Sequence, residues 1–188
     1  MEIFSSEEIG DLDTNQSMDR EDIKRYLEVL NIELKNRNVQ GEISIVGGAV
    51  MCLCYEARIS TTDIDAIFEP KMIIYECAKV VARNHNLSDD WLNDGVKGFL
   101  SSKGDFFEYA EMSNLKIYVA SPEYMLAMKC LSARLESFNE FEDIKFLLGY
   151  LKISTFEEAF AILKKFYPVD RYKVKIEYAL REILESYG

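Results

Sequence analysis

Apolar residues first recur with helical spacing in the segment that follows Asp19. Asp22 stands three residues after Asp19, a pattern typical of a helix N-terminus, and apolar residues then repeat every three or four positions. These residues are Ile23, Tyr26, Leu27, Leu30 and Leu34. The pattern predicts an amphipathic helix that runs to about Asn38 and ends before Gln40–Gly41.

Beyond this break, strand-like and helix-like patterns alternate as far as residue 120. We predict strands at 42–46 and 63–68, helices at 49–57 and 70–83, and a β-hairpin formed by 105–112 and 115–120. Residues 88–100 fit a mixture of helix and loop. From Pro122 onwards the pattern is helical, with segments near 122–135, 139–150, 154–166 and 170–186. The predicted fold class is α+β, with a small mixed sheet flanked by helices and followed by a C-terminal helical lobe.

The acidic charge of the chain is concentrated near its N-terminus. The net charge is −11, and residues 1–22 contribute −7 of it because they hold eight acidic residues and one arginine. The remaining −4 leaves the rest nearly balanced, so charge alone does not exclude a nucleic-acid substrate. We divide the chain into an acidic arm (1–22), an α/β core (23–120) and a helical lobe (121–188). The arm carries apolar residues that would anchor it on its own chain or on a second copy in a homodimer: Ile3, Phe4, Ile9 and Leu12.

Neither a membrane segment nor a zinc site is indicated. The longest apolar runs, around 43–50 and 115–120, have the length of strands, and the N-terminus is acidic where a signal peptide would be basic. We therefore expect a cytoplasmic protein without a membrane partner. The chain has one histidine, His85, and its cysteines lack CxxC spacing, so we expect reduced thiols in the core. The cysteines are Cys52, Cys54, Cys77 and Cys130.

The candidate chemistry lies in the segment VGGAVMCLCYEARISTTDID at 46–65. Residues two apart on a strand point to the same side, so Asp63 and Asp65 can offer two carboxylates to one Mg²⁺ or Mn²⁺ ion. Gly47 and Gly48 have no Cβ and would let the backbone approach a phosphate closely. The N-terminus of the helix that follows would supply N–H groups and the positive end of its dipole.

This arrangement resembles the nucleotidyltransferase superfamily with the polymerase-beta-like palm, in which a GG or GS turn precedes a DxD or DxE pair. Further segments are similar to the small bacterial nucleotidyltransferases of the DUF6036 type, which are related to the AbiEii and MenT toxins. These segments are TTDID at 61–65, WLND at 91–94, ASPEYMLAMKCLSAR at 120–134 and EFEDIKFLL at 140–148. The resemblance covers residues 23–188.

The resemblance implies a metal-dependent enzyme that moves NMP from an NTP to an acceptor hydroxyl. The acceptor stays open among an RNA end such as that of tRNA, a protein and a small molecule. A toxin role, with a cognate antitoxin as partner, is one form of this function. Asp63 and Asp65 would be the catalytic metal ligands for Mg²⁺ or Mn²⁺, Gly47 and Gly48 the nucleotide cradle, and Thr61 an orienting or phosphate-binding hydroxyl.

Later elements would complete the site. A third carboxylate is common in the superfamily, and Glu108 on the first hairpin strand is the candidate, with Asp105 and Glu111 as substitutes. Lys129, from a helix of otherwise mostly apolar residues, corresponds to a catalytic lysine thought to contact phosphate in AbiEii-like proteins.

The chain departs from the family pattern after this lysine. It reads NEFED at 139–143 where the pattern is RDxxD, so Asn139 replaces the arginine and Glu140 the first aspartate. The final Asp143 is kept, and the resemblance implies a nucleotide-binding role for it. Arg134 would compensate as a nucleotide-binding cation. The departure puts the rate and the acceptor in question more than the fold.

Each assignment has a structural alternative. The aspartate pair could cap a turn, Lys129 could extend to solvent, and Asp143 with Glu140 could form a solvated helix face. Trp91 and nearby aromatic residues suit a core, although one ring could stack on a base. The basic residues between Lys164 and Arg181 suit a solvated helical surface better than an RNA-binding one. For the whole protein, the alternative function is a catalytically silent module that binds nucleotide, RNA or protein.

Overall fold

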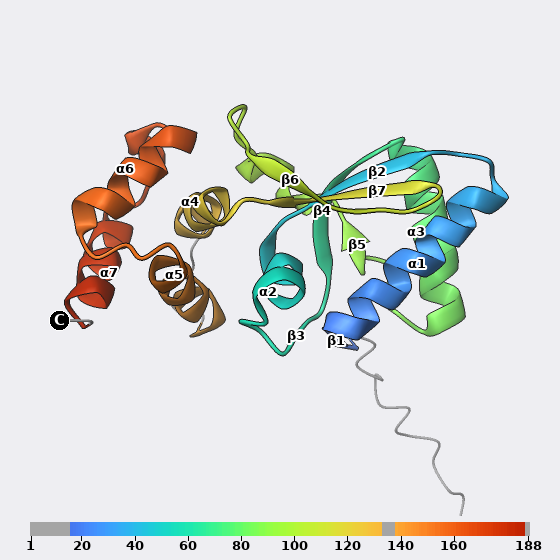
Figure 1. Cartoon of the computed structure of the whole chain (residues 1–188), viewed down its shortest axis with the longest axis horizontal. Helices are drawn as coiled ribbons and strands as arrows, with labels where there is room; N and C mark the ends of the chain where they lie inside the picture. Colours follow the sequence, from blue (N-terminus) through green and yellow to red (C-terminus); the bar gives the residue numbers. More distant parts are fainter. Residues whose placement is uncertain (1–15, 133–137, 187–188) are drawn as a thin grey trace, which may run out of the picture.

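The computed structural model describes residues 16–132 and 138–186, which form a mixed α+β fold that is 58% helical (Figure 1). A five-stranded mixed sheet has the strand order β5-β4-β2-β7-β6, and a separate two-stranded sheet pairs β1 with β3. The α+β prediction is confirmed at this level. No helix within these two ranges is long and apolar enough to cross a bilayer.

The first helix begins as its sequence predicts. β1 (Met18–Asp19) leads directly into α1 (Arg20–Asn36), and Asp19 and Asp22 form a capping box. The Asp22 N–H donates to Asp19 Oδ1 at 2.8 Å, and the Asp19 N–H donates to Asp22 Oδ2 at 3.2 Å. The predicted apolar stripe of this helix is buried. The short pairing of β1 with β3 (Ser60–Thr61) was not predicted.

The central strands of the sheet bury one face on the core. β2 (Gly41–Ile45) is antiparallel to β4 (Ile64–Glu69) and parallel to β7 (Leu115–Ala120), which in turn pairs with β6 (Phe106–Glu111) in the predicted hairpin. Alternate side chains of β2, β4 and β7 are buried, as expected for strands with one face on a core. The helices α1 and α3 (Lys71–His85) lie side by side along this sheet (Figure 1).

Residues 92–99 differ from the expected helix and loop. They form the two-residue strand β5 (Leu92–Asn93), which extends the sheet beside β4, and the 3₁₀ helix η1 (Gly95–Phe99). Trp91 is buried just before β5, and its indole N–H donates to the carbonyl of Ala78 at 2.9 Å. A strand of two residues is too short to show an alternating pattern, so the sequence carries no signal for it.

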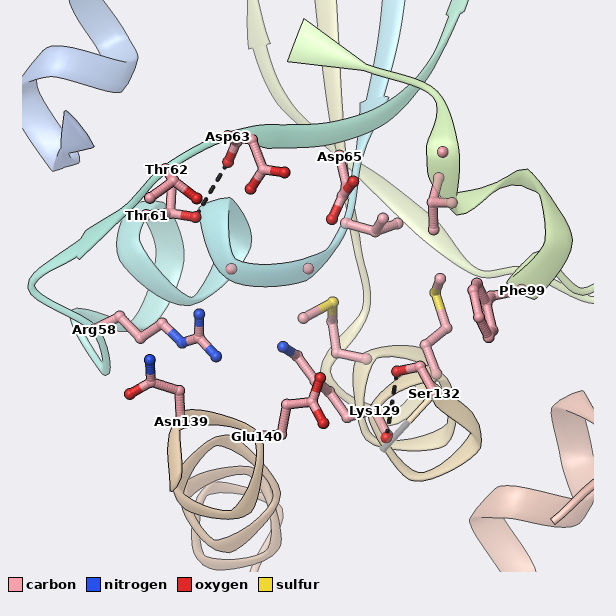
Figure 2. Close-up of a pocket in the computed structure, with 17 residues that line it drawn as sticks. Arg58, Thr61, Thr62, Asp63, Asp65, Phe99, Lys129, Ser132, Asn139 and Glu140 are labelled. Carbon is pink, nitrogen blue, oxygen red and sulfur yellow. Dashed lines mark hydrogen bonds between the residues drawn. The ribbon is translucent and has the colours of Figure 1, made fainter. Parts of the chain in front are cut away.

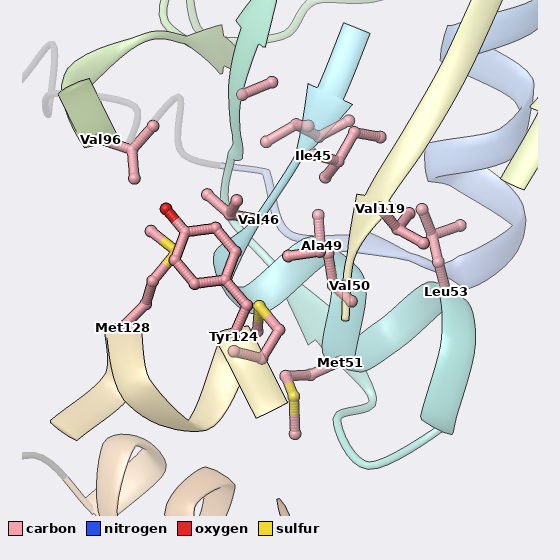
Figure 3. Packing of buried hydrophobic residues seen from close by; sticks show 14 of the residues in the cluster. Ile45, Val46, Ala49, Val50, Met51, Leu53, Val96, Val119, Tyr124 and Met128 are labelled. Carbon is pink, nitrogen blue, oxygen red and sulfur yellow. The ribbon is translucent and has the colours of Figure 1, made fainter. Parts of the chain in front are cut away.

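The helix after β2 begins earlier than predicted. α2 (Gly47–Tyr55) includes both glycines in its first turn, where we expected a turn before a helix at 49–57. Most of α2 is buried among Ile45, Val46 and Val119, as Figure 3 shows. Three of the four cysteines are buried and all four are free thiols, in agreement with the core thiols that we predicted.

Four helices gather at one end of the sheet (Figure 1). α4 (Pro122–Ser132) follows β7 directly, and α5 (Phe138–Tyr150) and α6 (Phe156–Phe166) both pack on α4. The 3₁₀ helix η2 (Val169–Arg171) then leads to α7 (Val174–Glu185), which packs on α6. These helices agree with the predicted helical segments, and α4 and α5 bring their side chains up to the end of the sheet where the glycines and aspartates lie.

Candidate functional site

A pocket of about 460 Å³ lies between the strand ends of the sheet and the helices α4 and α5. Figure 2 shows side chains from both sides of this pocket turned toward its interior. The core contributes the glycine pair, the aspartate pair, Arg58 and part of η1, whereas the helices contribute Lys129 and Glu140. The pocket therefore joins segments that stand up to 94 residues apart.

The side chains of Asp63 and Asp65 both point into this pocket (Figure 2). Asp63 immediately precedes β4 and Asp65 lies within it, so the two carboxylates share a side while the intervening Ile64 is fully buried. The Asn93 side chain donates to Asp63 Oδ2 at 3.3 Å. Both carboxylates line a cavity, as the metal-ligand prediction requires.

Burial changes the acidity of both carboxylates. Desolvation raises the pKa of Asp63 above its usual value, against the opposing effects of Asn93, Arg58 and Lys129. Desolvation also raises the pKa of Asp65, and the neighbouring charge of Asp63 adds to this rise. A cation bound between the two carboxylates would reduce their mutual repulsion and offset the cost of their partial desolvation.

The glycine pair lies beside Asp65 and forms part of the core side of the pocket. Gly47 has a positive φ of 71°, and a Cβ there would lie 3.1 Å from Asp65 Oδ2. A Cβ on Gly48 would lie 2.9 Å from Thr61 Oγ1 and 3.0 Å from Arg58 Nη1. Because both positions are in the first turn of α2, their backbone borders the pocket at the positive end of a helix dipole.

The Thr61 hydroxyl has a backbone partner. Its hydroxyl donates to the backbone carbonyl of Asp63 at 3.1 Å, and its side chain is largely buried. This bond holds the turn that leads into β4. Thr61 lines the pocket, and the structure supports an orienting role for it.

Lys129 reaches the pocket from α4 and is only 12% exposed, so it does not extend to solvent. Its Nζ lies 2.7 Å from Asp143 Oδ2. Asp143 is 3% exposed, which shows that the solvated helix face considered for it is wrong. It lies behind the pocket wall and holds two cations, Lys129 and Arg58, rather than lining the cavity itself.

The structure does not bring Glu108 to this site. Glu108 is exposed on the edge strand β6, and two strands, β2 and β7, separate β6 from β4. At the usual strand spacing this places it about 14 Å from the aspartate strand. Neither Asp105 nor Glu111 lines the pocket either. The third-carboxylate prediction therefore fails because β7, not β6, pairs with β2. Arg134 lies outside the described residues.

Two further residues of the site were missing from the sequence interpretation. Arg58, in the loop after α2, donates to Asp143 through Nε at 2.8 Å and through Nη2 at 2.6 Å. Asn93 binds Asp63, and its own Oδ1 accepts from the Gly95 N–H at 2.9 Å. Asn93 belongs to the WLND segment, which is one signal that could have pointed to it. The sequence around Arg58 offers no comparable signal.

The donor set fits a magnesium ion that is shared with a substrate. Within residues 16–132 and 138–186, no group of three or more His, Cys, Asp or Glu side chains is arranged to hold a metal. Mg²⁺ commonly takes only one or two carboxylates and completes its octahedron with water and substrate phosphates. Asp63 and Asp65, with no thiol or imidazole among the described residues lining the pocket, match that pattern.

Comparisons with known proteins found no protein-family model, no curated protein and no solved structure that matches this chain. The family resemblance thus stays a prediction, and function has to be argued from the geometry of the pocket.

Proposed function

We propose that this protein is a metal-dependent nucleotidyltransferase with a nucleotidyltransferase fold, which transfers NMP from an NTP to an acceptor hydroxyl. The observation that carries the proposal is that Asp63, Asp65 and the Gly47–Gly48 turn of α2 lie next to one another on the core side of a pocket, opposite α4 and α5. Carboxylates for a divalent ion and bare backbone for phosphate are the two components that this chemistry needs in one place.

The carboxylates hold the metal in this proposal. A bound Mg²⁺ or Mn²⁺ would neutralise charge on the α-phosphate and the leaving pyrophosphate during in-line attack by the acceptor oxygen. Asn93 orients Asp63 through its amide, and Thr61 fixes the backbone that carries Asp63. The two residues would thereby keep the carboxylate pair in one arrangement before substrate binds.

The triphosphate would lie against Gly47, Gly48 and the cations beside them. The Lys129 ammonium faces the pocket from α4, and the Arg58 guanidinium lies next to Gly48. Lysine and arginine both bind phosphate through charge-assisted hydrogen bonds. A Cβ on either glycine would make short contacts with Asp65, Thr61 or Arg58, so a side chain here would force these neighbours to shift.

The charge of the pocket makes the metal a requirement for nucleotide binding. Of the charged side chains known to line it, Asp63, Asp65 and Glu140 are acidic and Arg58 and Lys129 are basic. Asp143 already takes up part of the positive charge of both cations. A free NTP, which carries up to four negative charges, would be repelled by this set. Its magnesium complex carries two fewer negative charges and places a cation between the aspartates and the phosphates, so it would be repelled much less.

One observation favours the silent alternative, in which the fold binds nucleotide without turnover. No third carboxylate accompanies Asp63 and Asp65 among the described residues that line the pocket, apart from Glu140 on the opposite helix. Such a module would still bind Mg²⁺–NTP, so binding alone does not separate it from an enzyme.

A labelling experiment separates the two. The protein is incubated with Mg²⁺, a cell lysate and each NTP labelled either at the α- or at the γ-phosphate. Nucleotidyl transfer predicts that the α-label enters a macromolecular or small-molecule product and that the γ-label leaves as pyrophosphate. Entry of the γ-label instead would indicate a phosphotransferase. Absence of product with all four NTPs, together with Mg²⁺-dependent binding, would favour the silent module.

A further inference from the structure

The pocket has a second, apolar end that the phosphate chemistry leaves unused. Val96 and Phe99 of η1 and Met125 and Met128 of α4 line it. Val96 and Met128 are almost completely buried, and Figure 3 shows both of them beside the Tyr124 side chain. The Phe99 ring is 40% exposed and lies at the edge of the pocket, as Figure 2 shows. The pocket thus runs from a charged end to an end walled by a ring and aliphatic side chains.

Phe99 is held in place through its backbone. The hydroxyl of Tyr167 donates to the Phe99 carbonyl, and Arg171 Nη2 donates to the Gly98 carbonyl at 3.3 Å. Both donors come from the C-terminal helical lobe, so η1 is fixed between the sheet and that lobe. A half-exposed aromatic ring on such a segment is preorganised and loses little conformational freedom when a flat ligand covers it.

We propose that this apolar end is the nucleobase site and that the base stacks on the face of Phe99. This inference rests on the proposed function, because the triphosphate at Gly47–Gly48 fixes which part of the ligand reaches η1. The part of a nucleotide farthest from the γ-phosphate is uncharged, planar and aromatic. It is the part that suits a wall of Phe99, Val96 and the two methionines.

Stacking also determines what kind of selectivity to expect. The four side chains of this wall offer no hydrogen-bond donor and no strong acceptor to a base edge. The Ser132 hydroxyl, which also lines the pocket, donates to the Lys129 carbonyl. Every base has a π-face, so a ring surface binds all four bases with modest preferences. Phe99 therefore contributes affinity for nucleotides in general, and its loss weakens the binding of ATP, GTP, CTP and UTP alike.

The test compares a ligand that has a base with one that lacks it. Mg²⁺–NTP and Mg²⁺–tripolyphosphate are titrated calorimetrically into the full-length wild type, Phe99→Ala, Phe99→Leu and Phe99→Trp. We expect Phe99→Ala and Phe99→Leu to weaken NTP binding roughly 10- to 100-fold. Phe99→Trp should retain it, and tripolyphosphate should bind all four proteins equally. Phe107→Ala is the matched control, because Phe107 is 45% exposed on β6 and does not line the pocket.

The possible failures are distinct. Unchanged NTP binding in Phe99→Ala would overturn the inference while leaving the proposed function intact. So would an equal loss of tripolyphosphate binding, which would indicate that the ring shapes the phosphate site. Normal NTP binding with slower transfer would assign Phe99 to the acceptor and also overturn it. If the wild type binds neither ligand, the proposed function itself fails and the inference falls with it. Thermal unfolding of each variant shows whether it is folded.

Discussion

The carboxylate of Asp143 accepts two hydrogen bonds from the guanidinium of Arg58, at 2.8 and 2.6 Å, although 85 residues separate the two along the chain. Lys129 Nζ approaches the same carboxylate at 2.7 Å. Arg58 belongs to the α/β core, whereas Lys129 and Asp143 belong to α4 and α5. One buried anion thus connects the core to the helical lobe and sets the position of two cations at the pocket.

We predict that Asp143→Ala destabilises the protein by about 3 kcal/mol, because removing one partner leaves the other charges buried without compensation. The Arg58 and Lys129 side chains are only 19% and 12% exposed, so water cannot replace the lost carboxylate well. Urea unfolding followed by circular dichroism measures the change. Glu76→Ala is the control, since it removes the solvent-exposed ion pair with Arg37 and should have a much smaller effect. Equal effects of the two substitutions would contradict a structural role for Asp143.

A second prediction concerns the glycine wall. Gly47→Ala places a side chain on a residue with positive φ, which costs about 1–2 kcal/mol, and forces its Cβ toward the Asp65 carboxylate. We expect a lower free energy of unfolding and weaker Mg²⁺-dependent nucleotide binding. Gly149→Ala is the matched control, because Gly149 lies within α5 and a Cβ there meets no atom within 4 Å. It should be neutral or stabilise the helix by up to about 1 kcal/mol. Normal nucleotide binding by Gly47→Ala would argue against this wall as the phosphate site.

A third prediction uses the pH dependence of stability. Asp94 precedes η1 and contacts Lys71 Nζ at 2.6 Å, Lys97 Nζ, and the Tyr75 hydroxyl at 2.8 Å. These groups lower its pKa below the ordinary value of 3.8, so the folded state favours the charged form. Its contribution to stability is present above pH 3.8 and is lost as the pH falls further, toward the folded-state pKa.

Asp94→Asn should therefore be less stable than the wild type at pH 6, and the difference should shrink as the pH is lowered below about 4. The measurement is the free energy of unfolding in urea between pH 3 and pH 7 for both proteins. A difference that is constant over this range, or that grows on acidification, would mean that the ion pairs do not stabilise η1.

A fourth prediction concerns thiol chemistry. Burial raises the pKa of Cys130 to about 12 and that of Cys54 to about 11, and the thiolate is the reactive form. Both cysteines should resist an aromatic disulfide reagent in the native protein and react once urea is added. Mass spectrometry of peptides gives the rate at each position. Rapid labelling of Cys130 without denaturant would contradict its burial.

Sequence reasoning succeeded where the pattern is local. The capping box of Asp19 and Asp22, the apolar stripe of α1 and the alternation in β7 all depend on neighbours within a few residues. The two-residue period of a strand is equally local, and it places the side chains of Asp63 and Asp65 on one side of the chain. Gly47 and Asp65 are expected at one site because the spacing of the glycine turn and the aspartate pair resembles the nucleotidyltransferase pattern.

Sequence reasoning failed where the outcome depends on distant partners. The charges of α5 indicated a solvated face, yet Asp143 is buried because Arg58 approaches it from the core. The resemblance implies a third carboxylate on a later strand and favours Glu108. The sequence predicts the hairpin but not which of its strands pairs with β2, and β7 does so. Arg58 itself stands in a short polar loop, where nothing in the sequence indicates that it faces a pocket.

The central claim is that Asp63 and Asp65 bind a divalent ion together with a triphosphate. Calorimetric titration of an NTP with and without Mg²⁺ tests it most directly, with the wild type, Asp63→Asn and Asp65→Asn as the three proteins. The account predicts binding by the wild type only when Mg²⁺ is present, and its loss in both variants while their unfolding transitions remain cooperative. Equally tight binding without Mg²⁺, or unchanged Mg²⁺-dependent binding in either variant, would contradict it.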